Sequence, residues 1–101
     1  MSKLIISGAA GRMGRSLVLG AQESNEFTLV GAIESEYNES LGLDAGELAG
    51  IGKTGVLLSP RDESLIEQAD VMIDFSSPAA SISNAEICAE SGTALVIGTT
   101  G

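Results

Sequence analysis

Apolar residues along this chain occur in short runs that alternate with polar and glycine-rich stretches, a pattern typical of strands separated by helices. Leu4–Ile6 is a continuous apolar run, as expected for a strand buried on both faces of a parallel sheet. Four later runs predict further strands: Phe27–Ile33, Val56–Leu58, Asp70–Phe75 and Ala94–Gly98. Because the intervening segments are predicted to be helical, we expect one α/β domain over residues 1–101, with a doubly wound parallel sheet and right-handed crossovers.

The spacing of apolar residues between the first strands predicts two helices. The first follows the glycine-rich stretch, where four apolar residues share one helical face: Met13, Leu17, Val18 and Ala21. The second is expected to begin at Ser59 as N-cap, with Pro60 in the first turn and Asp62 completing a capping box. The apolar side of this second helix is expected to consist of three residues: Leu65, Ile66 and Ala69.

A third helix and a long loop complete the predicted elements. Ser77 is expected to cap this helix, with Pro78 at its first position and Gly92 at its end. Its inner face is predicted from three apolar residues: Ile82, Ala85 and Ala89. Residues 35–54 are rich in glycine, serine, asparagine and acidic residues, and we expect them to form a long, partly irregular, solvated loop.

Composition narrows the classes of function. Five basic residues against fourteen acidic ones give a net charge of −9, which argues against nucleic acid or an anionic membrane as partner. Cys88 is the single cysteine and histidine is absent, so we expect no disulfide and no metal site; Cys88 is expected to pack on a helix face. No stretch resembles a signal peptide or a membrane span, so a cytoplasmic protein is expected.

The glycine-rich stretch is the first candidate for chemistry. Gly8, Gly11 and Gly14 fit a G-x-x-G-x-x-G pattern, with Ala10 where the common dinucleotide fingerprint has its second glycine. Such a loop between a strand and a helix brings backbone close to a pyrophosphate and points the helix N-terminus at its charge. The glycines alone fit an ordinary tight turn equally well, so both interpretations stay open.

Three further segments are weighed against simpler explanations. Glu34 ends the second strand, where a carboxylate could accept hydrogen bonds from an adenosine ribose, or could be a solvated acid. Phe75–Ser77 and Gly98–Gly101 follow the fourth and fifth strands and could line a nicotinamide pocket, or could serve as a helix cap and a turn. Gly50–Gly55 is not a P-loop, because Glu47 replaces the required glycine and a strand follows.

Five blocks in order, "GAAGRMG", "GAIE", "LGLDAGELAGIGKTGV", "VMIDFSSP" and "VIGTTG", resemble the N-terminal domain of the 4-hydroxy-tetrahydrodipicolinate reductase family, also called dihydrodipicolinate reductase. The resemblance covers nearly the whole chain and implies a Rossmann-like domain that binds NADH or NADPH. It also implies a C-terminal domain, absent here, that binds a cyclic dicarboxylate substrate and builds a homotetramer. The alternative is a non-catalytic NAD-sensing module; a third possibility is a fragment that binds nothing.

The resemblance also implies which residues contact the cofactor. Six residues of the glycine loop would wrap the pyrophosphate: Gly8, Ala9, Ala10, Gly11, Arg12 and Met13. Glu34 would bind the adenosine ribose. Three residues would contact the nicotinamide side, with Thr100 nearest the substrate: Gly98, Thr99 and Thr100. Phe75 and Ser76 are further candidates for the same pocket.

Two departures from the family pattern bear on cofactor choice and activity. Many relatives carry basic residues at the positions of Ser35 and Ser77, which leaves Arg12 as the nearest cation and predicts a preference for NADH, or at most dual use. The family's catalytic His-His and Lys motif lies outside this chain, which has no histidine. We therefore expect the isolated chain to bind cofactor weakly and to turn over no substrate.

Overall fold

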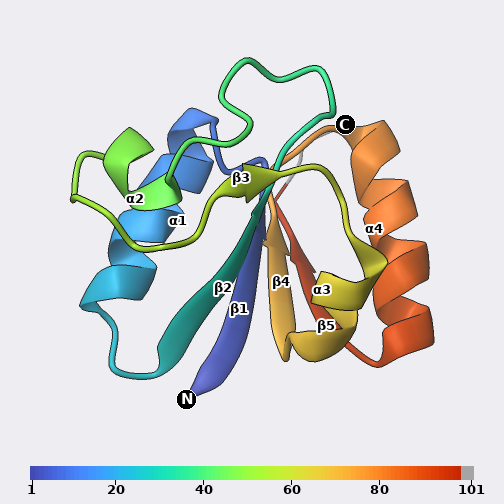
Figure 1. The fold of residues 1–101 in the computed structure, drawn as a ribbon. Coiled ribbons are helices and arrows are strands. Elements are labelled where there is room, and N and C mark those ends of the chain that lie inside the picture. The colour runs from blue at the N-terminus through green and yellow to red at the C-terminus, as the bar shows by residue number, and fades with distance from the viewer. Residues whose placement is uncertain (99–101) are drawn as a thin grey trace.

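The computed structural model describes residues 1–98 and places a five-stranded parallel sheet between two layers of helices (Figure 1). The strands lie in the order β3-β2-β1-β4-β5, with these bounds: β1 (Ser2–Ser7), β2 (Phe27–Ile33), β3 (Leu58–Ser59), β4 (Val71–Asp74) and β5 (Ala94–Ile97). The helices are α1 (Arg12–Glu23), α2 (Ala45–Leu48), α3 (Glu63–Gln68) and α4 (Pro78–Ser91). The predicted doubly wound, Rossmann-like α/β fold is confirmed.

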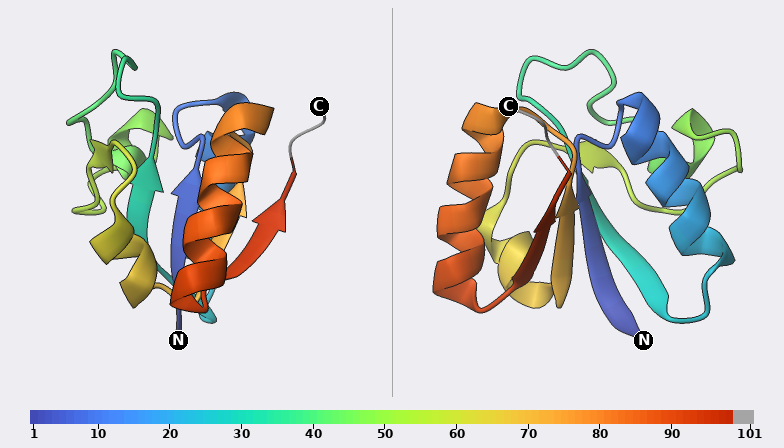
Figure 2. Two further views of the ribbon diagram at one scale, coloured as in Figure 1. Left: turned by 90° about the vertical axis from the view of Figure 1, so that its right-hand side faces the viewer. Right: turned by 180° about the vertical axis from the view of Figure 1, so that it is seen from behind.

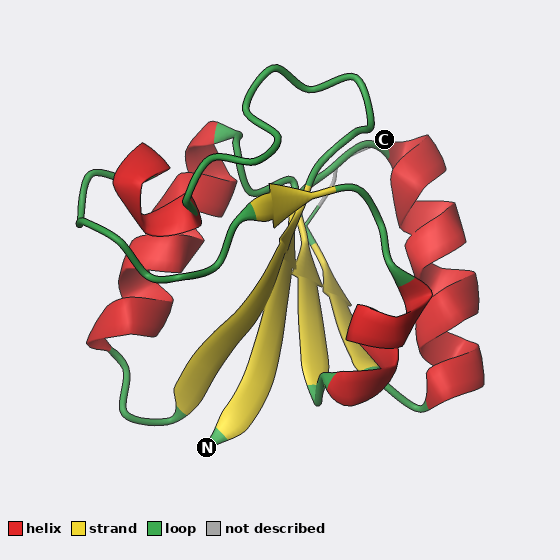
Figure 3. Cartoon of the chain, viewed as in Figure 1, coloured by secondary structure: helices red, strands yellow, loops and turns green. Residues whose placement is uncertain are grey.

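The two helical layers cover opposite faces of the sheet. Helices α1 and α2 lie on one face, and α3 and α4 lie on the other, as the opposed views of Figures 1 and 2 show. In Figure 3 the carboxyl ends of the strands meet at one edge of the sheet, below the loop that follows β2. Because all five strands are parallel, the segments that leave them gather at this edge, where open α/β sheets bind their ligands.

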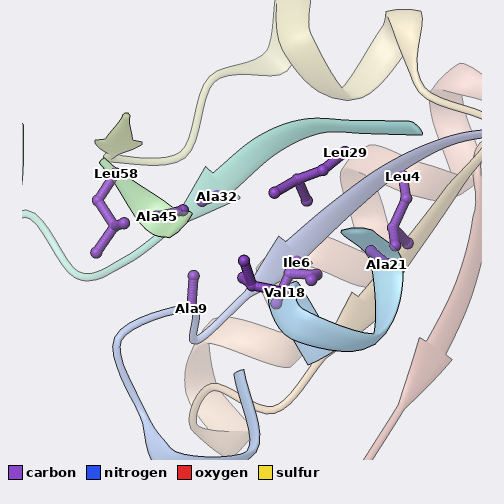
Figure 4. Packing of buried hydrophobic residues seen from close by; sticks show 9 residues of the cluster. All are labelled: Leu4, Ile6, Ala9, Val18, Ala21, Leu29, Ala32, Ala45 and Leu58. Atoms are coloured by element: carbon purple, nitrogen blue, oxygen red, sulfur yellow. The ribbon is translucent and has the colours of Figure 1, made fainter. Parts of the chain in front are cut away.

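Strand β1 occupies the centre of the sheet and is buried on both faces, as its continuous apolar run predicts. Leu4 and Ile6 belong to the core cluster under α1, which Figure 4 shows from close by. Ile5, one residue out of phase, belongs to the second cluster, with Ile66 of α3 and Cys88 of α4. Two separate cores therefore hold one helical layer each against the same strand.

The region around β3 departs from the prediction. The third strand is shorter and lies further along the chain than expected, because Leu57 forms an isolated antiparallel bridge with Asp44. Ser59 is part of the strand, and its carbonyl accepts a hydrogen bond from the amide of Glu34 at 3.0 Å. Ser59 is thereby held extended, so Asp62 and not Ser59 caps α3, by accepting from the amide of Ser64 at 2.9 Å.

Helix α4 turns a different face to the sheet from the one its apolar residues predict. Ser77 caps it and Gly92 ends it at φ 77°, as expected. The buried face, however, consists of Ser81, Asn84 and Cys88, whereas Ile82 is 64% exposed. Ala89 is exposed as well, and Ala85 is half-buried. The predicted inner face was wrong because polar side chains of α4 have hydrogen-bond partners in the sheet, described below.

Two smaller corrections concern α1 and the long loop. Leu17, Val18 and Ala21 face the core as predicted, but Met13 is 49% exposed at the start of α1. The loop over residues 35–54 contains the short helix α2, whose N-cap Asp44 is buried. Lys53 is exposed in the turn before β3, which agrees with the rejection of a P-loop.

Candidate functional site

A cavity of about 630 Å³ opens at the carboxyl ends of the strands. We call it the strand-end cavity. Its walls come from the glycine loop after β1, the segment after β2, the segment between β3 and α3 and the β4–α4 junction: Ser7, Gly8, Gly11, Ile33–Tyr37, Pro60, Arg61, Phe75–Ser77 and Ala80. This volume lies within the range of roughly 300–1,000 Å³ that holds small organic ligands. The cavity therefore has the size and the position of a ligand site in an open α/β sheet.

Glycine is present at the three positions of the loop for different physical reasons. Gly8 adopts φ 82°, and a Cβ there would lie 2.7 Å from the carbonyl oxygen of Phe75. A Cβ on Gly14 would lie 2.1 Å from the carbonyl oxygen of Gly8, so α1 packs directly on the loop. Gly11 has φ −73°, is exposed and lines the cavity, and a Cβ there would approach only the Gly8 carbonyl oxygen, at 3.3 Å. Close packing excludes a Cβ at Gly8 and Gly14, whereas at Gly11 the contact is tight but less severe.

The N-terminus of α1 is left uncapped at the wall of this cavity. Gly11 is its N-cap and has no side chain to accept from the first-turn amides, and that turn contains no acidic residue. The other helices in the described part of the chain are capped by side chains: Asp44, Asp62 and Ser77. A twelve-residue helix thus directs the positive end of its dipole and its free amides toward an external acceptor, which suits an anion such as a phosphate.

Glu34 lies across the glycine loop from this helix end. It is half-buried and lines the cavity, and its Oε2 accepts a hydrogen bond from the amide of Ala10 at 2.8 Å. Its Oε1 accepts from the amide of Ser35 at 3.2 Å. Glu34 is therefore not a freely solvated acid: it fixes the glycine loop, and its lone pairs not used for these bonds remain available to hydroxyl donors.

A buried polar network supports the β4 side of the cavity. Asp74 is fully buried; it accepts from the amide of Ser76 at 2.9 Å and, at 3.1 Å, from the Nδ2 of Asn84. The same Nδ2 donates to the hydroxyl of Ser7 at 3.1 Å, which links α4 to β1. Burial raises the pKa of Asp74, but hydrogen bonds from the side chains of Ser76, Asn84 and Ser81 and from the Ser76 amide outweigh it and lower the pKa overall. An ionised Asp74 thus fixes the β4–α4 junction from below.

The loop between β2 and β3 is organised by one carboxylate. Asp44 accepts from the amides of Gly46, Thr54 and Gly55 and from the hydroxyl of Thr54, at 2.8–3.1 Å. The Thr54 amide is the main cause that lowers the pKa of Asp44 far below its usual range, against a smaller contribution from burial. The expectation of a merely solvated connection was wrong here. The sequence does carry a signal for it, since Asp44 and Glu47 have the spacing of a helix cap.

The structure gathers some of the predicted site residues and separates others. Gly8, Gly11 and Glu34 line the cavity, as do the further candidates Phe75 and Ser76. Ala9 is buried in the α1 core, and Ala10 donates its amide to Glu34.

Arg12 and Met13 are exposed at the start of α1, and Arg12 lines a separate groove with Arg15. Gly98 packs on the ring of Phe75, where a Cβ would lie 2.2 Å from its Cζ. Thr99 and Thr100 lie outside the described residues.

Arg61, which the sequence reasoning did not single out, is the basic side chain that lines the strand-end cavity in the described part of the chain; Arg12 does not. One signal was present: only five basic residues occur, and Arg61 follows the third strand and Pro60 at the ligand-binding edge. Among residues 1–98, no group of acidic or cysteine side chains is arranged to hold a metal ion. Within the same range no helix has the length and apolarity needed to cross a membrane.

Comparison with known proteins bears on this geometry. Residues 2–101 match the family described as dihydrodipicolinate reductase, N-terminus. A 4-hydroxy-tetrahydrodipicolinate reductase of Afipia carboxidovorans is 50% identical over 99 residues, which cover 98% of this chain and 36% of that protein. The corresponding protein of Chromohalobacter salexigens is 44% identical over 101 residues, or 100% of this chain and 38% of the relative.

This chain therefore spans little more than a third of the length of these relatives. A solved structure of dipicolinate-bound dihydrodipicolinate reductase from Paenisporosarcina matches with a TM-score of 0.77 over 100% of this chain and 38% of that one. At 24% identity this match supports the fold alone. The family match and the two closely similar sequences support more: this chain belongs to the dihydrodipicolinate reductase family, as its N-terminal part.

Proposed function

We propose that this chain is the cofactor-binding part of a 4-hydroxy-tetrahydrodipicolinate reductase and that it holds a pyridine nucleotide, preferably NADH, in the strand-end cavity. The observation that carries the proposal is the uncapped N-terminus of α1, with Gly11 at the cavity wall and Glu34 across the loop. Family membership supports the same ligand and does not favour the alternative of a non-catalytic NAD sensor.

The residues present fit a dinucleotide at both of its polar ends. The absence of a Cβ on Gly11 lets a pyrophosphate approach the first-turn amides of α1, beginning with those of Arg12 and Met13. Glu34, already oriented by the amide of Ala10, accepts hydrogen bonds from the adenosine ribose hydroxyls. Phe75 and Ser76, at the end of β4, line the cavity on the side that we propose for the nicotinamide. Gly98, Thr99 and Thr100 stay proposed contacts of the nicotinamide on the basis of the family resemblance.

The chemistry is hydride donation from the reduced nicotinamide, which the cofactor supplies when bound. The contribution of this chain is to bind and orient the nucleotide. We assign three features to the part of the protein that corresponds to the remaining two thirds of its relatives. These are the binding of the cyclic dicarboxylate substrate, the proton donor and the homotetramer interface. Since this chain has no histidine, residues 1–101 alone are expected to bind nucleotide without reducing substrate.

The preference for NADH follows from charge at the ribose end. Ser35 occupies the position after Glu34, where a basic residue would favour the binding of a 2′-phosphate. Glu36 adds a second carboxylate to the lining of the cavity. Two carboxylates repel a phosphate monoester, whereas Glu34 pairs with free hydroxyls. Dissociation constants for NADH and NADPH, measured by calorimetry, test the preference; tighter binding of NADPH would contradict it.

Glu34→Gln tests the ribose contact itself. The amide oxygen of glutamine can still accept from Ala10, so the glycine loop is retained while the charge is lost. We expect NADH to bind about tenfold more weakly, since hydrogen bonds to a charged group contribute roughly 1.5–3 kcal/mol, and the discrimination against NADPH to shrink. Glu86→Gln, exposed on α4 and away from the cavity wall, is the control with the same change of charge. Unchanged NADH affinity in Glu34→Gln would remove Glu34 from the ribose site.

A further inference from the structure

We propose that Arg61 is the residue through which this protein tolerates a 2′-phosphate on the ribose, and so sets how strongly NADPH is discriminated against. The inference rests on the proposed function, because it concerns the adenosine end of the same cavity. Arg61 lies in the segment between β3 and α3 and lines the cavity together with Glu34 and Ser35. No other basic side chain within residues 1–98 lines it.

Arg61 is held in place by α4. Its Nε donates to the Oδ1 of Asn84 at 2.7 Å, and its Nη2 donates to the carbonyl oxygen of Ala80 at 3.3 Å. Asn84 is fully buried and is itself fixed by Ser7 and Asp74. An arginine anchored along one edge in this way loses less side-chain entropy when it binds a ligand than a free surface arginine does.

The anchoring leaves the charge of Arg61 available. Both of its partners in the described part of the chain are neutral, a carboxamide and a backbone carbonyl, so no carboxylate there offsets the guanidinium. Two of the five guanidinium N–H groups are used in these bonds, and the Nη1 amino group remains for a ligand. A planar guanidinium with free donors and an uncompensated charge is well suited to a phosphate monoester.

Without Arg61 the cavity would repel that phosphate, because the other charged residues lining it are Glu34 and Glu36. Free ribose hydroxyls need no cation, since Glu34 can accept from them directly. Arg61 therefore acts on NADPH and has little effect on NADH. The two carboxylates make NADH the preferred cofactor, and Arg61 determines how large the preference over NADPH is.

The test compares dissociation constants of NADH and NADPH for the intact protein and for Arg61→Ala, measured by calorimetry at low ionic strength. We expect NADPH to bind about tenfold more weakly in Arg61→Ala, the loss of a charge-assisted hydrogen bond, and NADH to change less than twofold. Added salt should weaken NADPH binding more in the wild type than in the variant, because the charge pair is screened. Arg61→Lys, which keeps the charge but not the planar fork, should recover part of the loss.

Lys53→Ala is the matched control, since it removes the same charge from an exposed turn outside the cavity wall. Equal weakening of both nucleotides in Arg61→Ala, or no change in either, overturns the inference and leaves the proposed function intact. Failure of the wild type to bind NADH at all is the separate result that overturns the proposed function, and the inference with it. Circular dichroism melts of each variant confirm that the compared proteins are folded.

Discussion

Replacing Gly14 by alanine tests whether α1 needs a glycine to pack on the loop after β1. The added Cβ would lie 2.1 Å from the carbonyl oxygen of Gly8 and 2.7 Å from the Cα of Ala9. Both neighbours are backbone atoms, and the amide of Gly8 is itself hydrogen-bonded to the carbonyl of Ile33 at 2.9 Å. No side-chain rotation can relieve this contact, so the start of α1 must move away from the sheet.

The expected magnitude is the difference between two effects of opposite sign. Overpacking of a well-packed region costs about 1–3 kcal/mol, and the rigid backbone here favours the upper end of that range. Alanine in a helix gains about 1 kcal/mol over glycine. The net loss is therefore about 2 kcal/mol, which lowers the melting temperature of a domain of this size by roughly 8–16 °C.

Gly20→Ala is the matched control in the same helix. A Cβ on Gly20 would meet no atom within 4 Å, so only the gain in helix propensity remains. This variant should be more stable by about 1 kcal/mol, with a melting temperature about 4–8 °C higher.

Thermal melts and urea titrations of both variants provide the measurement. A Gly14→Ala protein as stable as the wild type would refute the packing argument. If Gly14→Ala yields no folded protein, the raised stability of Gly20→Ala still checks the reasoning, because a destabilised Gly20→Ala would contradict it.

Three further predictions concern buried polar groups. Hydrogen bonds lower the pKa of Asp44 in the folded state below its ordinary 3.8, so its ionised form stabilises the fold above about pH 4 and this contribution is lost as the pH falls further. Asp44→Asn should be less stable than the wild type at pH 7 in urea titrations, with a smaller difference at pH 3; an equal difference at both pH values would contradict this. Asn84→Ala should cost about 1–3 kcal/mol, because Ser7, Asp74 and Arg61 all lose a partner, whereas Glu86→Ala on the outer side of α4 should be nearly neutral in the same titration. Burial and the charge of Asp74 raise the pKa of Cys88, so at pH 8 its thiol should react with a disulfide reagent far more slowly in the native protein than in urea; equal rates would contradict its burial.

The fold followed from local patterns in the sequence. Leu4–Ile6 and Phe27–Ile33 predicted the central strands, since a continuous apolar run is stable only where both faces of a sheet are covered. Ser77 and Gly92 marked the ends of α4 because cap residues act within a few positions of themselves. These signals are short in range, and the structure confirmed them.

The inner face of α4 could not be predicted in this way. Its apolar periodicity favoured Ile82, but Asn84 and Ser81 are buried because their partners are Asp74 and Ser7, at the ends of two other strands. A polar side chain is buried only when a partner is available, and the partner's position is a property of the assembled sheet.

The candidate site was likewise predicted in part from the sequence and decided in part by the fold. The glycine spacing and Glu34 were visible in the sequence, and they located the cavity, but the sequence could not separate a tight turn from a phosphate loop. Tertiary packing accounts for Gly8 and Gly14 by close contacts and leaves Gly11 at the uncapped end of α1, and these contacts support the proposed phosphate site. Arg61 lines the cavity while bonded to Asn84, a residue 23 positions away, a contact that the sequence does not reveal. The sequence thus determined the elements and the ends of the strands, whereas the fold decided which side chains face the cavity, since that depends on contacts between distant segments.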